Sequence, residues 1–273
     1  MISSTLIICV FTFSIHFVET IAYALRIAGI KTKHMATALS LITSILLISR
    51  LSNMLQAPIL GLKVDLAIQE ASQLALLHLE NQFRIIIFAA FLGSLIGGIA
   101  LPLFNHIFIF VIENMKQKKS LFQASARLFI PSKDHPLAHI KHIYSFKKNL
   151  SLNLKGLPKQ FLIYNIIITA IYTIGVLCSL LASAYLPEYR ATAIQLSGAV
   201  NGIATILLAT IVDPVGAQIT DSVYTGKRQE SVIFTVVFFL ISTRLIGTLI
   251  LAQFLLKPFS HYLVWITKHL VGF

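Results

Sequence analysis

Charged residues are scarce in this sequence: only 12% of its 273 residues are Asp, Glu, Lys or Arg, whereas 56% are hydrophobic. Together with a mean hydropathy of +0.83, this composition excludes an ordinary soluble domain and indicates a protein of the lipid bilayer. The sequence also contains only two cysteines, Cys9 and Cys178, both within apolar runs. So few thiols argue against a disulfide framework and against a thiolate metal site.

Enzyme motifs are missing as well. The sequence has no H-E-x-x-H, no P-loop and no G-x-S-x-G, and its few intramembrane acids do not form the close pairs that two-carboxylate chemistry uses. We therefore expect no enzymatic activity and no cofactor. His135, His139 and His142 recur at helical spacing, but Pro136 interrupts them and Lys141 adds positive charge beside them, so we expect no metal site.

Long apolar runs dominate what is present. A helix needs about 20 apolar residues to cross roughly 30 Å of hydrocarbon, and six runs are long enough: about 4–25, 36–57, 85–111, 161–185, 191–212 and 232–256. None shows the alternation typical of a membrane β-strand, and only helices or closed barrels satisfy their own backbone polar groups in lipid. The sequence therefore predicts an all-α polytopic membrane protein with six transmembrane helices.

The distribution of Lys and Arg predicts the orientation of these spans. No Lys or Arg precedes the first run, so we expect it to be retained rather than cleaved as a signal peptide. With the N-terminus outside, fifteen of the 22 basic residues lie on the inner side and five on the outer side. Ten of the inner ones lie in 112–160, which we interpret as a basic cytoplasmic loop with interfacial helices on anionic headgroups. Nucleic-acid binding is not expected.

Two similar segments indicate an internal duplication. "ATALSL" at 36–41 and "ATAIQL" at 191–196 share four of six residues, and each opens an apolar run. Pro58 and Pro214 follow 22 and 23 residues after these starts. Under the predicted orientation the two helices run in opposite directions, which is typical of an inverted repeat with a central site between its halves. We predict a 3+3 inverted-topology repeat of 1–111 and 161–273, with both prolines breaking helices at opposite gates.

Polar side chains beside these prolines are unexpected, because amides are costly in lipid. Asn53 and Gln56 precede Pro58, and Asp213 precedes Pro214. One interpretation is that they face a polar cavity between the halves, where Asn53 and Gln56 contact a substrate. The other is that they are groups at helix ends that reach interfacial water.

Two arginines, Arg50 and Arg244, lie within predicted spans without an acidic neighbour on their own helix face. A central arginine costs at least about 2.5 to 3.5 kcal/mol on insertion scales, and its planar fork of donors suits a phosphate or diphosphate. We assign both to substrate binding. Glu19 either contacts the substrate with them or forms a structural ion pair with one of them. His16 shares a helix face with Glu19, and these two residues, with Asp213, are candidates for ion or proton coupling.

A small-residue face lies in the third run, where Gly93, Gly97 and Gly98 flank Ser94. Such a face permits either close helix packing or relative movement of helices.

The segments "ETIAYALRIAGIKTKHMATALSL" (19–41) and "SRLSNMLQAPILGLKVD" (49–65) resemble the Amj family of bacterial lipid II flippases, as does the six-span pattern. The resemblance implies a protein of the bacterial cytoplasmic membrane that moves undecaprenyl-linked peptidoglycan precursor from the inner to the outer leaflet, with lipid II and membrane lipids as its partners. Arg26 would then receive the diphosphate from the inner headgroup region.

Two other classes of function remain open from the residues. A cation- or proton-coupled transporter of a small solute would use the same repeat, with His16 and Glu19 as coupling groups. A membrane scaffold that does not transport would recruit partners through 112–160.

The first testable prediction concerns orientation. In a chain without Cys9 and Cys178, we expect Arg190→Cys to react with an impermeant thiol reagent on intact cells. Lys147→Cys should react only after the membrane is permeabilised, because its loop carries the inner positive charge. Labelling of position 147 on intact cells would overturn the predicted orientation.

Overall fold

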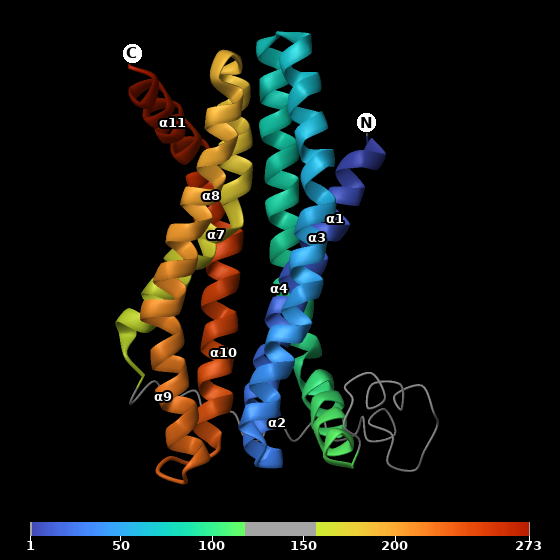
Figure 1. Ribbon diagram of the computed structural model, residues 1–273, viewed down its shortest axis with the longest axis vertical. Coiled ribbons are helices and arrows are strands. Elements are labelled where there is room, and N and C mark those ends of the chain that lie inside the picture. The colour runs from blue at the N-terminus through green and yellow to red at the C-terminus, as the bar shows by residue number, and fades with distance from the viewer. Residues whose placement is uncertain (1, 118–156, 273) are drawn as a thin grey trace.

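The computed structural model describes residues 2–117 and 157–272, and within these ranges the chain is helical apart from short turns (Figure 1). The helices are α1 (Ile2–Ile21), α2 (Tyr23–Thr32), α3 (Met35–Glu70), α4 (Gln73–Gln117), α7 (Lys159–Tyr185), η3 (Pro187–Tyr189), α8 (Arg190–Leu207), η4 (Leu208–Val212), α9 (Asp213–Tyr224), α10 (Ser231–Ile246), η5 (Gly247–Leu251) and α11 (Ala252–Val271).

Six helical stretches in the described residues are long and apolar enough to cross a membrane. They are Ser4–Thr32, Met35–Glu70, Gln73–Met115, Lys159–Tyr185, Pro187–Tyr224 and Ser231–Val271. The prediction of an all-α protein with six spans is therefore confirmed. The central part of the predicted loop, 118–156, lies outside the described residues, as do His135, His139 and His142. Its first residues belong to a helix, because α4 continues to Gln117.

The expected helix breaks at the two prolines are not present. Helix α3 passes through Pro58 and ends only at Glu70. The side chain of Pro58 is exposed. A membrane helix tolerates the loss of the single backbone hydrogen bond that a proline removes. Pro214 lies in the first turn of α9, directly after the π-helical turn η4. The wider π-turn accommodates the missing N–H, so the helical stretch continues to Tyr224.

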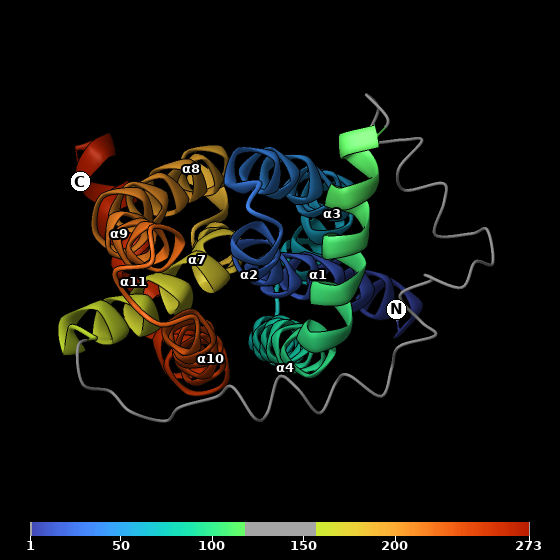
Figure 2. The same ribbon diagram turned by 90° about the horizontal axis from the view of Figure 1, so that it is seen from below.

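The helices form two groups that lie side by side (Figure 2). In the first, α1 packs extensively against α4 and α3, and α2 packs against the same two helices. In the second, α7 is central and packs against α8 and α11. We call these groups the N-half and the C-half. The α2–α3 and α9–α10 connections lie together at the lower end of Figure 1, and the α3–α4 and α7–α8 connections lie at its upper end.

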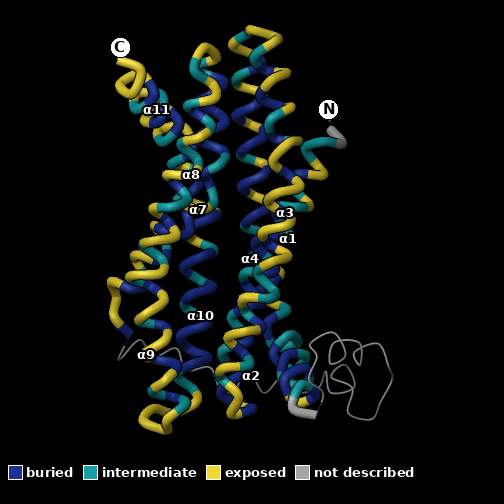
Figure 3. Tube along the Cα trace, viewed as in Figure 1, coloured by how far each residue is buried: buried dark blue, intermediate teal, exposed yellow. Residues whose placement is uncertain are grey.

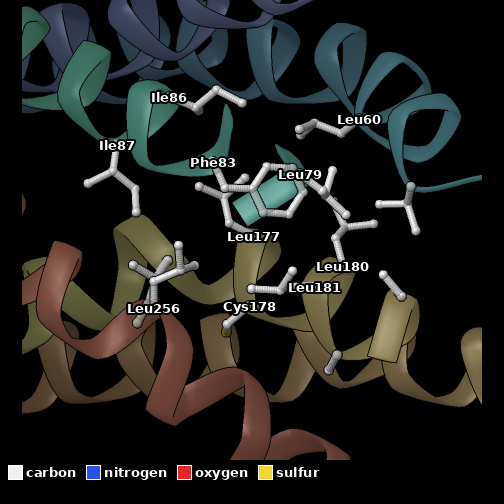
Figure 4. Packing of buried hydrophobic residues seen from close by; sticks show 14 of the residues in the cluster. Leu60, Leu79, Phe83, Ile86, Ile87, Leu177, Cys178, Leu180, Leu181 and Leu256 are labelled. Carbon is white, nitrogen blue, oxygen red and sulfur yellow. The ribbon is translucent and has the colours of Figure 1, made fainter. Parts of the chain in front are cut away.

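A large apolar cluster joins the halves in the upper part of Figure 1. Leu60 of α3 and Phe83 of α4 face Leu177 and Leu181 of α7, with Leu256 of α11 beside them (Figure 4). Phe83, Leu181 and Leu256 are completely buried. On the outside of the bundle, most positions are exposed (Figure 3). Exposed leucines and phenylalanines around a buried interior are typical of a protein surrounded by lipid.

The small-residue face packs tightly. A Cβ atom added to Gly93 would collide with the backbone carbonyl of Phe13 in α1, and one added to Gly97 would lie 3.0 Å from the carbonyl oxygen of Phe17. Gly98 faces α10 instead, with Ile241 Cγ2 at 2.9 Å from its would-be Cβ. Of the two interpretations, close packing is what these contacts support, because α1 and α4 approach each other through backbone atoms.

The second testable prediction follows from this contact. Gly93→Ala should destabilise the protein by about 1 to 3 kcal/mol, because α1 has to move away from α4 to admit the methyl group. Gly61→Ala is the matched control, since Gly61 is also inside a helix and nothing lies within 4 Å of its would-be Cβ. Thermal unfolding in detergent measures both. Equal midpoints for the two variants would contradict the tight packing.

Candidate functional site

A cavity of about 550 Å³ lies between the two halves. It is lined by α1, α2 and α3 of the N-half and by α7, α8, η4, α9 and α10 of the C-half. On α3 the lining residues run from Leu39 to Arg50, whereas the apolar cluster begins at Leu60 of the same helix. The cavity therefore occupies the lower part of Figure 1, and the apolar cluster closes it from above.

The cavity opens sideways between α3 and α8. Leu39, Thr43 and Arg50 on α3 are exposed, as are Thr205 of α8 and Asp213 at the start of α9. The lining residues of the inner wall are mostly buried, among them Ile168, Thr169, Leu240 and Arg244. A group with a polar head and an apolar tail therefore fits this shape, with the head inside and the tail between the two helices in lipid.

An ion pair forms the deep end of the cavity. The Arg244 guanidinium of α10 donates through Nη2 to Oε2 of Glu19 on α1, and their side chains are only 8% and 13% exposed. Arg244 Nε also donates to Ser94 Oγ at 3.2 Å, and Nη2 lies 3.0 Å from Nδ1 of His16. Because a guanidinium can only donate, Nδ1 of His16 accepts this bond. A buried charge is tolerated only with such a set of partners.

The other carboxylate oxygen of Glu19 accepts hydrogen bonds from both halves. Ser49 Oγ of α3 donates to Oε1 at 2.9 Å, and the Tyr172 hydroxyl of α7 donates to the same atom at 3.1 Å. With Arg244 and Ser94, this carboxylate connects α1, α3, α4, α7 and α10 at one level of the bundle. We call Glu19, Arg244, His16, Ser49, Ser94 and Tyr172 the central cluster.

Two further arginines line the cavity nearer its opening. Arg50 is exposed, and it forms no ion pair within the part of the chain that the structure describes. Arg26 of α2 donates through Nη2 to Oδ1 of Asp213 at 3.2 Å, which joins the N-half to the C-half. The cavity thus has one buried cation with several partners, one cation in a single ion pair and, within the described residues, one cation without an acidic partner, an arrangement suited to an anionic group.

Asn53 and Gln56 do not line the cavity, which corrects the expectation that they face it. Gln56 is buried between α1 and α3, where its Oε1 accepts from Thr12 Oγ1 at 2.9 Å and its Nε2 donates to Asn53 Oδ1 at 3.0 Å. Asn53 is exposed. The amide of Gln56 therefore fastens two helices of the N-half, because each of its polar atoms has a partner inside that half.

Sequence patterns did not identify Ser49, Ser94 and Tyr172 as site residues. Serines and tyrosines are common in membrane helices, and their spacing carries no signal. One indirect sign was available: Arg244 lacked an acid on its own helix face, so an acidic partner had to come from another helix. Within the described residues, no group of three or more His, Cys, Asp or Glu side chains is placed to hold a metal ion.

The whole chain is similar to known proteins. The sequence profile of the Amj family, described as "Alternate to MurJ", matches residues 11–267. The chain is 36% identical over 267 residues to a protein named Lipid II flippase Amj from Bacillus subtilis (strain 168), and the match covers 97% of each chain. No solved structure matches this chain. A profile match of this extent, with an identity of this size along nearly the full length of a relative, identifies the chain as a member of the Amj family.

Proposed function

We propose that this protein is a lipid II flippase of the bacterial cytoplasmic membrane, which moves the undecaprenyl-linked precursor from the inner to the outer leaflet. The family membership and the 36% identity to a relative of that name support the proposal. The observation that carries it is the cavity, because three arginines line a space between the halves that opens sideways between two exposed apolar helix faces.

The chemistry of lipid II fits this cavity. The molecule carries a diphosphate, a disaccharide with a peptide, and a long polyprenyl tail. Arg26 and Arg50 offer planar forks of donors to the diphosphate. The tail remains in lipid at the opening between α3 and α8, so only the polar part has to leave the hydrocarbon. Transport of this kind forms no covalent bond, and we assign the protein no catalytic residue.

We assign the central cluster two roles, attraction of the diphosphate and compensation of the buried charge. Arg244 lines the deep end of the cavity, where it attracts the diphosphate, while Glu19 keeps its charge compensated in the empty protein. Lys31, Lys33, Lys227 and Arg228 lie at the connections in the lower part of Figure 1. We place that end in the cytoplasm, since basic residues favour the inner side. The cavity then faces the inner leaflet, from which the substrate comes.

Alternating access follows from this orientation. The apolar cluster of Leu60, Phe83 and Leu181 closes the outer side, and export requires the two halves to separate there while the inner side closes. We interpret the halves as an inverted repeat, as in many transporters. Because α3 and the helix of Pro214 are continuous, gating in this proposal is a movement between the halves, with Pro58 and Pro214 as points of bending.

A coupled transporter of a small solute remains the second candidate, and one observation favours it. His16 and Glu19 lie buried beside Arg244, as coupling groups do in proton-driven carriers. That function predicts transport of a solute without a polyprenyl tail. A scaffold that does not transport predicts that substitution of the cavity arginines has no effect.

The third testable prediction concerns Arg50. Arg50→Gln should lower lipid II export at least about tenfold, because it removes the cavity cation that has no acidic partner within the described residues, and Arg50→Lys should restore part of it, since an ammonium lacks the bidentate fork. Arg190→Gln is the control: Arg190 is also exposed but pairs with Asp65 at 3.3 Å outside the cavity. A leaflet assay for lipid II in proteoliposomes measures all three. Normal export by Arg50→Gln would refute the proposal.

The fourth testable prediction separates structure from binding at Arg244. Glu19→Gln alone should cost about 3 to 5 kcal/mol of stability, because it leaves a buried charge uncompensated. Adding Arg244→Gln should recover membrane abundance and thermal stability, since both charges are then gone. Export should stay low in the double variant, because the deep cation is absent. A double variant that exports at the normal rate would show that the pair only fastens helices.

A further inference from the structure

A carboxylate, that of Asp213, lines the cavity that we propose binds an anion. Asp213 lines the same space as Arg26 and Arg50, and its carboxylate is 53% exposed. Its ion pair with Arg26, at 3.2 Å, is the contact that Asp213 makes among the described residues. A carboxylate in this position binds one of the groups that the substrate's diphosphate needs.

The second carboxylate of the cavity lining, Glu19, is held very differently. Glu19 is 13% exposed and binds Arg244, Ser49 and Tyr172. Release of Arg244 therefore requires a buried ion pair to break, together with the contacts of Arg244 with Ser94 and His16. The pair of Asp213 and Arg26 is a single contact in which the carboxylate is 53% and the guanidinium 18% exposed, and a partly exposed ion pair is weaker than a buried one with several partners. Of the two, the pair at Asp213 is the one that an entering anion can displace.

A glycine leaves the space in which the Arg26 guanidinium lies. A Cβ atom added to Gly216, one turn after Asp213, would collide with Nη1 of Arg26. The guanidinium therefore rests against the backbone of α9, and Nη2 reaches Asp213 from there. A side chain at position 216 would force the guanidinium to move from this place. The absence of a side chain there thus makes room for Arg26 beside Asp213.

We propose that Asp213 is an internal competitor for the substrate's diphosphate. In the empty protein it holds Arg26 at the wall of the cavity; an entering diphosphate displaces it and is bound by Arg26 together with Arg50. When the diphosphate leaves, Asp213 binds Arg26 again, which assists release. This inference rests on the proposed function, because it assigns the diphosphate of a prenyl-linked substrate to the cavity.

The fifth testable prediction measures binding rather than transport. Farnesyl diphosphate serves as the probe, titrated into the purified full-length protein in detergent. Asp213→Asn should bind it about three- to tenfold more tightly than the unmodified chain, because Arg26 no longer has to leave a carboxylate. Asp65→Asn is the matched control: Asp65 also joins the halves through an arginine, at 3.3 Å and 51% exposed, but lies outside the cavity. Asp65→Asn should bind farnesyl diphosphate with the same affinity as the unmodified chain.

Two further variants test whether Asp213 acts through Arg26. In an Arg26→Gln background, Asp213→Asn should give no increase in affinity; an increase that persists would mean that only the field of the carboxylate matters, and would overturn the proposal. Gly216→Ala keeps both charges but moves Arg26 off Asp213, so affinity should rise, and a fall would equally overturn it.

The result also separates this inference from the proposed function. If the unmodified, folded protein binds farnesyl diphosphate but Asp213→Asn binds it no better, the competitor role is wrong and the flippase proposal stands. If the unmodified protein binds no prenyl diphosphate at all, both are wrong.

Discussion

The buried ion pair between Glu19 and Arg244 is the constraint on which the arrangement of the helices depends. Two charges inside an apolar bundle are costly, and they are tolerated only where they pair with each other and have further hydrogen-bond partners. Here the partners come from separate helices: Ser49 donates from α3, Tyr172 donates from α7 and Ser94 accepts on α4. Satisfying one carboxylate and one guanidinium therefore fixes the level at which five helices meet, and with it the deep end of the cavity.

That level divides the interior into two parts with different properties. Above it, Leu60, Phe83 and Leu181 belong to the apolar cluster that joins the halves (Figure 4). Below it, α3 and α8 separate, and the cavity is polar where Arg26, Arg50 and Asp213 line it. Each half is meanwhile held together internally, in the N-half through the glycine contacts of α4 with α1. Tight packing within a half and a cavity between the halves favour movement of one half against the other.

The three cavity arginines illustrate how partners decide the role of a residue type. Arg244 is buried and contacts Glu19, Ser94 and His16, Arg26 forms one ion pair, and Arg50 has no acidic partner in the described chain. A new partner for Arg50 breaks no existing ion pair, whereas a new partner for Arg26 or Arg244 has to compete with a carboxylate. The three arginines therefore differ in how easily they can bind another group, and this difference comes from their contacts alone, because the side chain is the same.

The sequence by itself determined the membrane class and the six spans, and it singled out Arg50, Arg244 and Glu19 as candidate site residues, because hydropathy and the cost of charge in lipid are local properties. It also left open whether Glu19 would pair with an arginine. Only the tertiary structure decided that Arg244 is the partner, that Gln56 binds Thr12 away from the cavity, and that α3 continues through Pro58. These outcomes depend on which helix faces come together, and spacing along one chain cannot specify a contact between residues more than 200 positions apart.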